Sequence, residues 1–235
     1  MEIALYLIPV TLGPTEVNQV LPSYNHDVIM GIRHFIVENI RSARRFLRQV
    51  DREFPIDNSV FYEMGKHADE RLFSQYLQAL RDGKPMGVIS EAGCPAVADP
   101  GADVVAIAQR QNLRVIPLVG PSSMIMAVMG SGLNGQSFAF NGYLPVDPQD
   151  RAKKLKNLET RAWNEHQTQL FIETPYRNLK MFQALLQNLR PQTRMCIAAG
   201  ITTTDEYIHT HTIAEWKKIE LPDLSKVPAI FLINK

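Results

Sequence analysis

A loop suited to binding a small ligand is the most informative chemical feature of the sequence. Two glycines and two prolines lie among the twelve residues from Ser90 to Gly101, between an apolar run and a helical pattern. A loop at the carboxyl end of a parallel strand lies where open α/β sheets bind ligands. Small residues such as Gly93 and Ala98 let a ligand approach the main chain. A tight strand-to-helix connection would contain the same Gly and Pro residues, so a ligand-binding loop and a purely structural connection both stay open.

A second loop repeats this pattern from Gly120 to Met124, after the apolar run Val115 to Leu118. Ser122 or Ser123 could cap the following helix, or the free amides at the helix start could meet a carboxylate. Two such loops would line a common crevice, which suits a ligand with a carboxylate and an apolar face. Neither loop has the spacing of the common phosphate-binding motifs, GxGxxG and Gly-Lys-Ser/Thr.

Five arginines form what we call the arginine stripe. At about 100° per residue they fall on one face of a predicted helix, opposite apolar residues. The region from Gly31 to Arg52 holds six Arg against Glu38 and Asp51. Such a surplus suits a phosphate backbone, although a merely solvated helix face has the same pattern. The members of the arginine stripe are Arg41, Arg44, Arg45, Arg48 and Arg52.

The cysteines and histidines carry weaker signals. Cys94 and Cys196 are far apart and lack CxxC spacing, which favours a reducing compartment over a disulfide scaffold or zinc cluster. No histidine near Cys94 in sequence would activate it as a nucleophile. His209 and His211 point to the same side of a strand, but without a nearby third ligand we expect a surface pair and no metal.

Composition indicates a globular chain. The 235 residues carry 25 Lys and Arg against 24 Asp and Glu, and 45% are hydrophobic. The net charge of +1 excludes a polycation or an acidic tail as the main theme, so any nucleic-acid contact must come from a local patch. Without a signal-peptide pattern or an apolar run of about 20 residues, we expect a soluble, cytoplasmic protein.

The order of the predicted strands and helices differs between the two halves of the chain, which predicts two domains. Strands alternate with helices in the first half, as in parallel βαβ units, whereas the second half predicts a mixed, partly antiparallel sheet. We expect an N-terminal α/β domain over 1–118 and a C-terminal α/β domain over 119–235.

The predicted strands and helices are as follows. The strands are Ala4 to Ile8, His34 to Val37, Val60 to Tyr62, Met86 to Ile89, Arg114 to Leu118, Phe138 to Tyr143, Gln169 to Glu173, Met195 to Ala199, Tyr207 to Thr212 and Ala229 to Ile233. The helices are Ser42 to Glu53, Ala68 to Arg81, Ala102 to Gln111 and Met124 to Met129, with two longer helices in the second half. Gly83 stands where a helix-ending glycine is expected.

Segments spread in order over nearly the whole chain resemble the tetrapyrrole methylase superfamily. Within it, the sequence is most similar to the ribosomal RNA small-subunit (cytidine-2′-O)-methyltransferases. The matching segments are Ser90 to Gly101, Val119 to Ser123, Gly132 to Leu133, Phe138, Gly142 to Pro145, Phe171 to Arg177, Ala199 to Glu206 and Ala229 to Asn234.

The resemblance implies a two-domain enzyme, usually a homodimer, with S-adenosylmethionine bound in the cleft between the domains. Its substrate would be ribosomal RNA or the small ribosomal subunit, methylated at a ribose 2′-hydroxyl. By position, the cofactor would contact Gly93, Cys94, Pro95, Val97, Ser123, Met124, Ile172 or Glu173, Ala199 and Pro228.

The matched segments also suggest roles in the reaction. Alignment of the acceptor with the methyl group supplies most of the catalysis of methyl transfer. Because a ribose hydroxyl is a poor nucleophile, a base would help, and Glu38 and Glu173 are the candidates. Arg41 or Arg177 would orient a phosphate or carboxylate, with Arg44 and Arg48 as further substrate contacts. Glu38 and Arg41 could equally form a helix-start ion pair.

Two segments depart from the RNA-modifying branch. Pro9 to Thr15 keeps only the flanking Pro and Gly of a Pro-Thr-Pro-Ile-Gly-Asn-Leu-like loop, and Asn39 replaces an acidic residue. Both segments would face the substrate. These differences therefore weaken the assignment of the substrate more than the assignment of the cofactor. The alternatives are a relative that methylates a tetrapyrrole or a protein side chain, and a non-catalytic protein that binds RNA or senses the cofactor.

Overall fold

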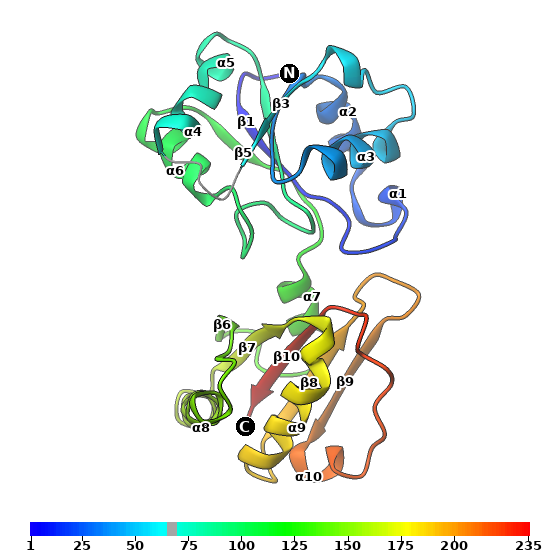
Figure 1. Ribbon diagram of the computed structural model, residues 1–235, viewed down its shortest axis with the longest axis vertical. Helices are drawn as coiled ribbons and strands as arrows, with labels where there is room; N and C mark the ends of the chain where they lie inside the picture. Colours follow the sequence, from blue (N-terminus) through cyan, green and yellow to red (C-terminus); the bar gives the residue numbers. More distant parts are fainter. Residues whose placement is uncertain (65–69) are drawn as a thin grey trace. The chain divides into compact units, whose positions relative to one another are not determined.

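The computed structural model divides into two compact units, Met1–Ser122 and Ser123–Lys235 (Figure 1). It describes residues 1–64 and 70–235. The division falls between Ser122 and Ser123, slightly beyond the boundary expected at Leu118. Each unit is built on its own five-stranded sheet.

The first unit contains an all-parallel sheet. Its strand order is β3-β2-β4-β1-β5, and every strand pairs in parallel with its neighbours. This confirms the βαβ prediction. The strands are β1 (Leu5–Ile8), β2 (His34–Val37), β3 (Val60–Glu63), β4 (Met86–Ile89) and β5 (Val115–Pro117).

Helices cover both faces of this sheet. One core cluster joins Tyr6 and Ile8 to α2 and α3, and a second joins Leu5 and Val88 to α4, α5 and α6. Burial on both faces explains why the central strands are apolar throughout. The helices are α1 (Val17–Val20), α2 (Ser23–Met30), α3 (Ile40–Val50), α4 (Glu70–Tyr76), α5 (Gln78–Arg81) and α6 (Ala102–Arg110), with a 3-10 turn, η1 (Ile56–Asn58).

Helix α3 begins and ends earlier than the predicted Ser42 to Glu53. The Asn39 side chain accepts hydrogen bonds from two N–H groups of the first turn, so the helix starts at Ile40. Asp51 has extended backbone angles and stops the helix after Val50. Arg52 therefore lies outside α3, and only the first four members of the arginine stripe lie on it.

The helix predicted from Ala68 to Arg81 is interrupted. It forms α4 and α5, which are separated at Leu77, and its predicted first residues, Ala68 and Asp69, lie outside the described residues. Gly83 adopts a positive φ of 79° after α5, as a helix-ending glycine does.

The second unit contains a mixed sheet of order β6-β7-β10-β8-β9. β6 pairs with β7 in parallel, and the other pairs are antiparallel. This arrangement confirms the predicted mixed sheet. The strands are β6 (Phe138–Tyr143), β7 (Thr168–Glu173), β8 (Arg194–Ala199), β9 (Tyr207–Thr212) and β10 (Ala229–Asn234).

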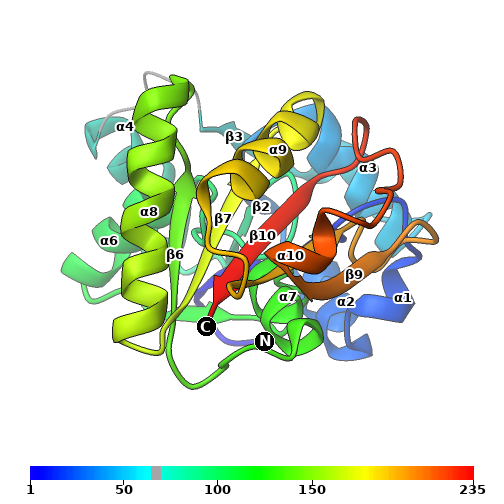
Figure 2. The same ribbon diagram turned by 90° about the horizontal axis from the view of Figure 1, so that it is seen from below.

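Helices α8, α9 and α10 pack together over this second sheet (Figure 2). Leu155, Phe182 and Trp216 bring these helices into one core with alternate residues of the strands. Helix α7 contacts β8, β9 and β10 instead, and Thr210 donates a hydrogen bond to the Ser131 carbonyl. The bounds are α7 (Ser123–Ser131), α8 (Pro148–Asn164), α9 (Asn178–Asn188), α10 (Ile213–Trp216) and a 3-10 turn, η2 (Pro175–Arg177).

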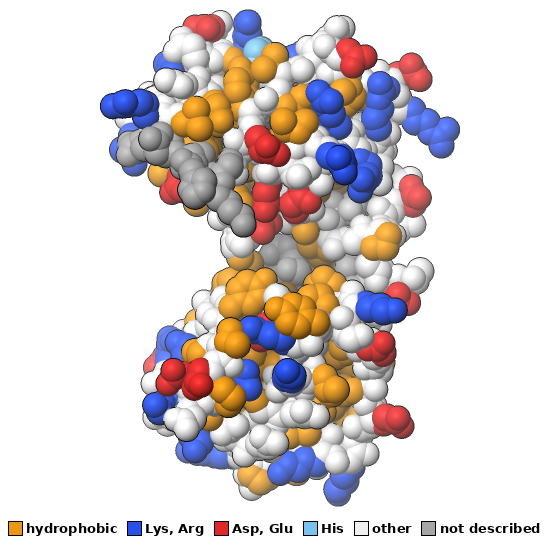
Figure 3. All heavy atoms as spheres, viewed as in Figure 1, with side chains coloured by type: hydrophobic (Ala, Val, Ile, Leu, Met, Phe, Trp, Pro, Cys, Tyr) orange, Lys and Arg blue, Asp and Glu red, His pale blue; other side chains and the backbone are white. Residues whose placement is uncertain are grey.

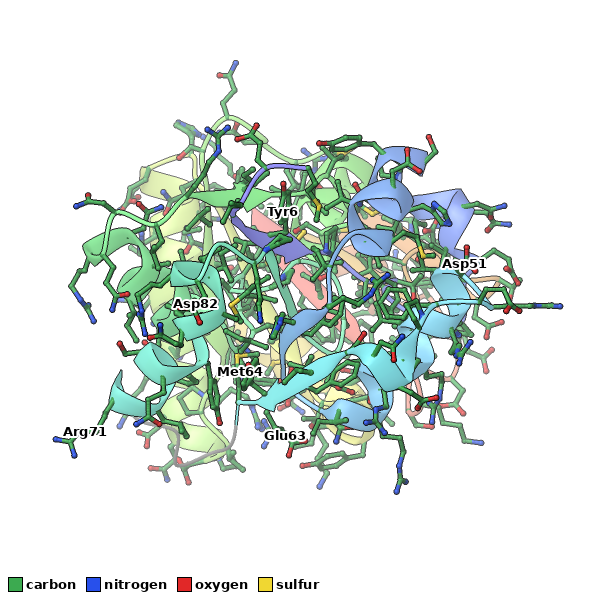
Figure 4. The ribbon with its side chains drawn as sticks, turned by 90° about the horizontal axis from the view of Figure 1, so that it is seen from above. Tyr6, Asp51, Glu63, Met64, Arg71 and Asp82 are labelled. Carbon is green, nitrogen blue, oxygen red and sulfur yellow. The ribbon has the colours of Figure 1, made fainter. Side chains whose placement is uncertain are left out.

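An ion pair fastens α2 to the end of α3. His26 Nε2 lies 3.0 Å from Asp51 Oδ2, and His26 Nδ1 lies 3.3 Å from Asp27 Oδ1. Figure 4 labels Asp51 at the end of α3. The hydrogen bonds with Asp51 and then Asp27 raise the pKa of His26 above its usual 6.5. The same contact with His26 lowers the pKa of Asp51 below its usual 3.8.

This pair makes stability depend on pH. It stabilises the fold fully between pH 3.8 and 6.5, and its contribution is lost as the pH rises through the raised pKa of His26. In urea unfolding, we expect His26→Gln to be less stable than the unmodified chain at about pH 5.5, with the difference much smaller at about pH 9. A difference that is equal at both pH values would contradict this assignment.

Candidate functional site

Three loops meet at the carboxyl ends of β1, β4 and β5 of the first sheet. The Val10 N–H, after β1, donates to the Gly93 carbonyl, after β4, over 2.9 Å. Cys94 Sγ lies 3.4 Å from the carbonyl oxygen of Pro121, after β5. The two glycine-rich loops singled out in the sequence therefore contact each other at one edge of the sheet, where α/β folds bind ligands.

Two glycines allow these loops to approach so closely. Gly93 adopts a φ of +66°, and a Cβ there would lie 3.1 Å from Leu12 Cδ2. A Cβ at Gly120 would lie 2.2 Å from Pro9 Cγ, a distance that no real contact permits. The backbone path at this edge thus depends on the absence of side chains.

Acidic groups occupy the neighbouring part of the same edge. The Glu91 N–H donates to Glu38 Oε2 over 3.1 Å, and the Ser42 hydroxyl donates to Glu91 Oε2 over 3.0 Å. We call Glu38, Glu91 and Asp99 the acid cluster. It joins the end of β2 to the loop after β4.

Burial and neighbouring negative charge raise the pKa values of Glu38 and Asp99. Burial is the main cause of the raised pKa of Glu38, and the charges of Asp99 and Glu91 add to it against the opposing hydrogen bond from the Glu91 N–H. Burial likewise raises the pKa of Asp99, with a further contribution from Glu91. A carboxylate with a raised pKa is a stronger base, as proton abstraction requires.

Cys94 is placed for packing rather than for nucleophilic attack. Burial raises the pKa of its thiol, and the charge of Asp99 raises it further. A thiol with a raised pKa is a poor nucleophile because the thiolate is the reactive form. Its neighbour Pro95 is buried, whereas Val97 is exposed.

The residues predicted to bind the cofactor in the second unit share one edge of its sheet. Ala229, at the start of β10, pairs with Glu173 at the end of β7 and with Ala199 at the end of β8. The Gly200 N–H donates to the Pro228 carbonyl over 3.3 Å. Ile172 precedes Glu173 on the same strand end, while Ser123 and Met124 begin α7.

Glu173 and Arg177 form a tight, largely buried ion pair. Arg177 Nη2 lies 2.7 Å from Glu173 Oε2, and the Glu173 side chain is 1% exposed. The other carboxyl oxygen, Oε1, accepts from the Thr174 N–H over 2.7 Å. Glu173 is therefore committed to holding Arg177, whereas the partly buried Glu38 accepts a hydrogen bond from the Glu91 N–H. The geometry favours Glu38 over Glu173 as a base.

The arginines of α3 form an exposed face that begins at Arg41, three residues after Glu38. Phe46 and Leu47 are buried on the opposite side of the helix. The Arg44 guanidinium lies 5.1 Å from the centre of the Phe61 ring. Among the four arginines of α3, we predicted substrate contacts for Arg41, Arg44 and Arg48.

Some features of the site had no predicted role. Glu91 and Asp99 were not singled out, although two carboxylates within a ligand-binding loop were a visible signal. Each unit also has a surface hollow of its own. One of about 390 Å³ lies among α1, α2 and α3, and one of about 430 Å³ lies beside the start of β9, but neither is lined by the predicted cofactor residues.

The described residues, 1–64 and 70–235, contain neither a metal-binding cluster nor a membrane-spanning helix. No group of three or more His, Cys, Asp or Glu side chains there is arranged to hold a metal ion. No helix there combines the length and the apolarity needed to cross a membrane.

Two known proteins are similar to most of the chain in sequence. The ribosomal RNA small subunit methyltransferase I of Vibrio cholerae is 29% identical over 212 residues, which cover 90% of this chain and 69% of the relative. The protein of the same name from Buchnera aphidicola is 25% identical over 234 residues, which cover 98% and 78%. No model of a protein family matches the chain.

Solved structures share the fold at low sequence identity. The methyltransferase CobJ has a TM-score of 0.63 at 12% identity, over 99% of this chain and 94% of that one. Uroporphyrin-III C-methyltransferase from Thermus thermophilus, complexed with S-adenosyl homocysteine, has a TM-score of 0.51 at 18% identity, over 99% and 97%. These likenesses confirm the predicted two-domain architecture.

The contact of Gly120 with Pro9 can be tested directly. We expect Gly120→Ala to lower the free energy of unfolding by about 1–3 kcal/mol, because the new methyl group must displace the Pro9 ring. Gly135→Ala is the matched control, since its Cβ would lie 3.4 Å from Val128 Cγ1, an ordinary contact. Urea unfolding compares the two variants, and equal effects would refute the close approach.

Proposed function

We propose that the chain is an S-adenosylmethionine-dependent methyltransferase of the tetrapyrrole methylase superfamily and that it methylates a ribose 2′-hydroxyl in the RNA of the small ribosomal subunit. The main observation in favour of an RNA substrate is the arginine face of α3, whose first member, Arg41, follows Glu38 by three residues. The relatives named small subunit methyltransferases support the same substrate.

The residues present fit the cofactor. Gly93, which has a positive φ and no side chain, would provide backbone groups, and Pro95, Val97, Ile172 and Ala199 would provide apolar contacts. We propose that these residues, with Cys94, Ser123, Met124 and Pro228, contact the cofactor. When bound, the sulfonium supplies an activated methyl group for in-line transfer.

The chain's own contribution to the chemistry is to orient the acceptor and take its proton. We propose that Glu38 accepts a hydrogen bond from the ribose hydroxyl and receives its proton as the new oxygen–carbon bond forms. The raised pKa of Glu38, caused mainly by burial, suits this role. Arg41, Arg44 and Arg48 would contact RNA phosphates on either side of the acceptor.

A tetrapyrrole substrate fits the site less well. The structural neighbours that act on uroporphyrin share only the fold with this chain. The acid cluster would repel the carboxylates that such macrocycles carry, whereas an extended arginine face exceeds what a single macrocycle needs. An RNA substrate would place the activity in the cytoplasm. The predicted homodimer is a separate proposal, which sedimentation of the purified chain can test.

The substrate assignment is tested with labelled S-adenosylmethionine. We expect label to enter undermodified small ribosomal subunits and to stay on the ribose after the bases are removed, because the acceptor is a hydroxyl of the sugar. Label in a tetrapyrrole instead would refute the RNA assignment. Cofactor binding without label in either substrate would favour a sensor.

Charge reversal on α3 tests the RNA contact. We expect Arg44→Glu with Arg48→Glu to weaken RNA binding about tenfold or more at low salt and to reduce the salt dependence by about two phosphate contacts. Lys156→Glu with Lys217→Glu makes the same charge change on the second unit and serves as the control. Filter binding at several salt concentrations measures both, and equal losses would contradict a specific role for α3.

Replacement of Glu38 tests the base. We expect Glu38→Gln to slow methyl transfer about 10²–10⁴-fold while calorimetry shows unchanged cofactor binding. In the unmodified chain, activity should rise with pH through the raised pKa of Glu38, because the base acts when deprotonated. Asp99→Asn should move this rise to lower pH, since it removes a neighbouring negative charge. An unmoved pH profile would contradict the assignment.

A further inference from the structure

Two tyrosines and an arginine lie together at one edge of the second sheet. Tyr143 ends β6 and pairs with Ile172 near the end of the parallel strand β7. Tyr176 and Arg177 belong to η2, which begins two residues after β7 ends. Because the carboxyl ends of parallel strands meet at one edge, all three side chains originate there.

A β-bulge sets the position of Tyr143. The register of β6 with β7 shifts between Phe140 and Tyr143, and Gly142 within the bulge has a φ of +64°. A bulge re-aims the side chain that follows it, and such bulges are common beside functional sites. The local distortion therefore places an aromatic ring where a regular strand would have Gly142 opposite Ile172.

Both tyrosine rings are left uncovered by the fold. Tyr143 is 60% exposed and Tyr176 is 73% exposed. The ring–ring contacts of the described residues involve neither of them, and hydrophobic side chains are visible on this unit's surface in Figure 3. Exposed aromatic faces offer stacking area that the protein's own core does not use.

The charge of Arg177 is held in place by its ion pair with Glu173. The hydrogen bond to Glu173 raises the pKa of Arg177 above its usual value, and the nearby hydroxyls of Tyr176 and Tyr143 contribute in the same direction. Arg177 Nε is buried and has no hydrogen-bond partner among the described residues. The same edge therefore carries a cation held by Glu173 and two exposed aromatic rings.

We propose that Tyr143 and Tyr176 stack on unpaired bases of the RNA substrate, with Arg177 beside the phosphate that links them. The proposal rests on the proposed function and adds a single-stranded RNA contact on the second unit. Stacking on aromatic rings tolerates any base sequence, and a neighbouring arginine adds attraction to phosphate. A single-stranded loop is the form of RNA whose bases are free to stack in this way.

The test compares a normal oligonucleotide with an abasic one. The probes are a single-stranded RNA segment of the small ribosomal subunit and the same length of RNA with its central bases removed. Fluorescence anisotropy measures their binding to the full chain. We expect the unmodified chain to bind the abasic RNA about tenfold more weakly, because the stacking partners are gone while the phosphates remain.

The variants locate that loss. Tyr143→Ala with Tyr176→Ala should bind normal RNA about tenfold more weakly and should no longer distinguish it from abasic RNA, whereas Tyr143→Phe with Tyr176→Phe should keep both properties, since the rings remain. Tyr24→Ala is the matched control, a 62% exposed tyrosine on α2 of the first unit, and should behave as the unmodified chain.

Three results would overturn the proposal. In the first, the double alanine variant keeps the full preference for normal over abasic RNA. In the second, it changes the sedimentation of the chain without RNA and leaves that preference intact, which assigns the rings to a contact between copies. In the third, the unmodified chain binds both RNAs equally, which contradicts stacking but leaves the methyl-transfer proposal standing. A separate outcome, in which the chain binds neither RNA, would refute the proposed RNA function itself.

Discussion

The close approach of three backbone segments at the edge of the first sheet is the constraint on which the candidate site depends. Gly120 lies against Pro9, and Gly93 lies against Leu12 and Pro121. The loops after β1, β4 and β5 therefore pack directly against one another. This contact holds the three loops together at the carboxyl ends of a fully parallel sheet. The acid cluster lies beside it because Glu38 directly follows β2, the strand next to β4 in the sheet.

Opposite charges are separated over a short stretch of chain. Burial, and then the charge of Asp99, raise the pKa of the partly buried Glu38, while the arginines of α3 face solvent. Asn39 divides the two regions, since its side chain accepts hydrogen bonds from the first turn of α3. A nucleic acid requires both kinds of region, a basic track for its phosphates and a hydrogen-bond acceptor for its ribose.

The strands and the two glycine-rich loops could be predicted from sequence. The spacing of apolar residues indicates the strands, and the positions of Gly and Pro indicate the loops. β2 and β4 have the predicted bounds, and their burial on both sides explains the strong signal. Helix ends were harder to predict, since side-chain capping at Asn39 and extended angles at Asp51 decide them locally. The role of Glu173 could not be read from spacing, because its burial against Arg177 is a property of the folded unit.

The chain crosses from one unit to the other only once, between Ser122 and Ser123. Every member of the first two core clusters precedes this crossing, and every member of the third follows it. Translation therefore delivers all the residues of the first core before any residue of the second unit emerges from the ribosome. The first unit can complete its hydrophobic interior on the nascent chain, as domains that fold one after another do.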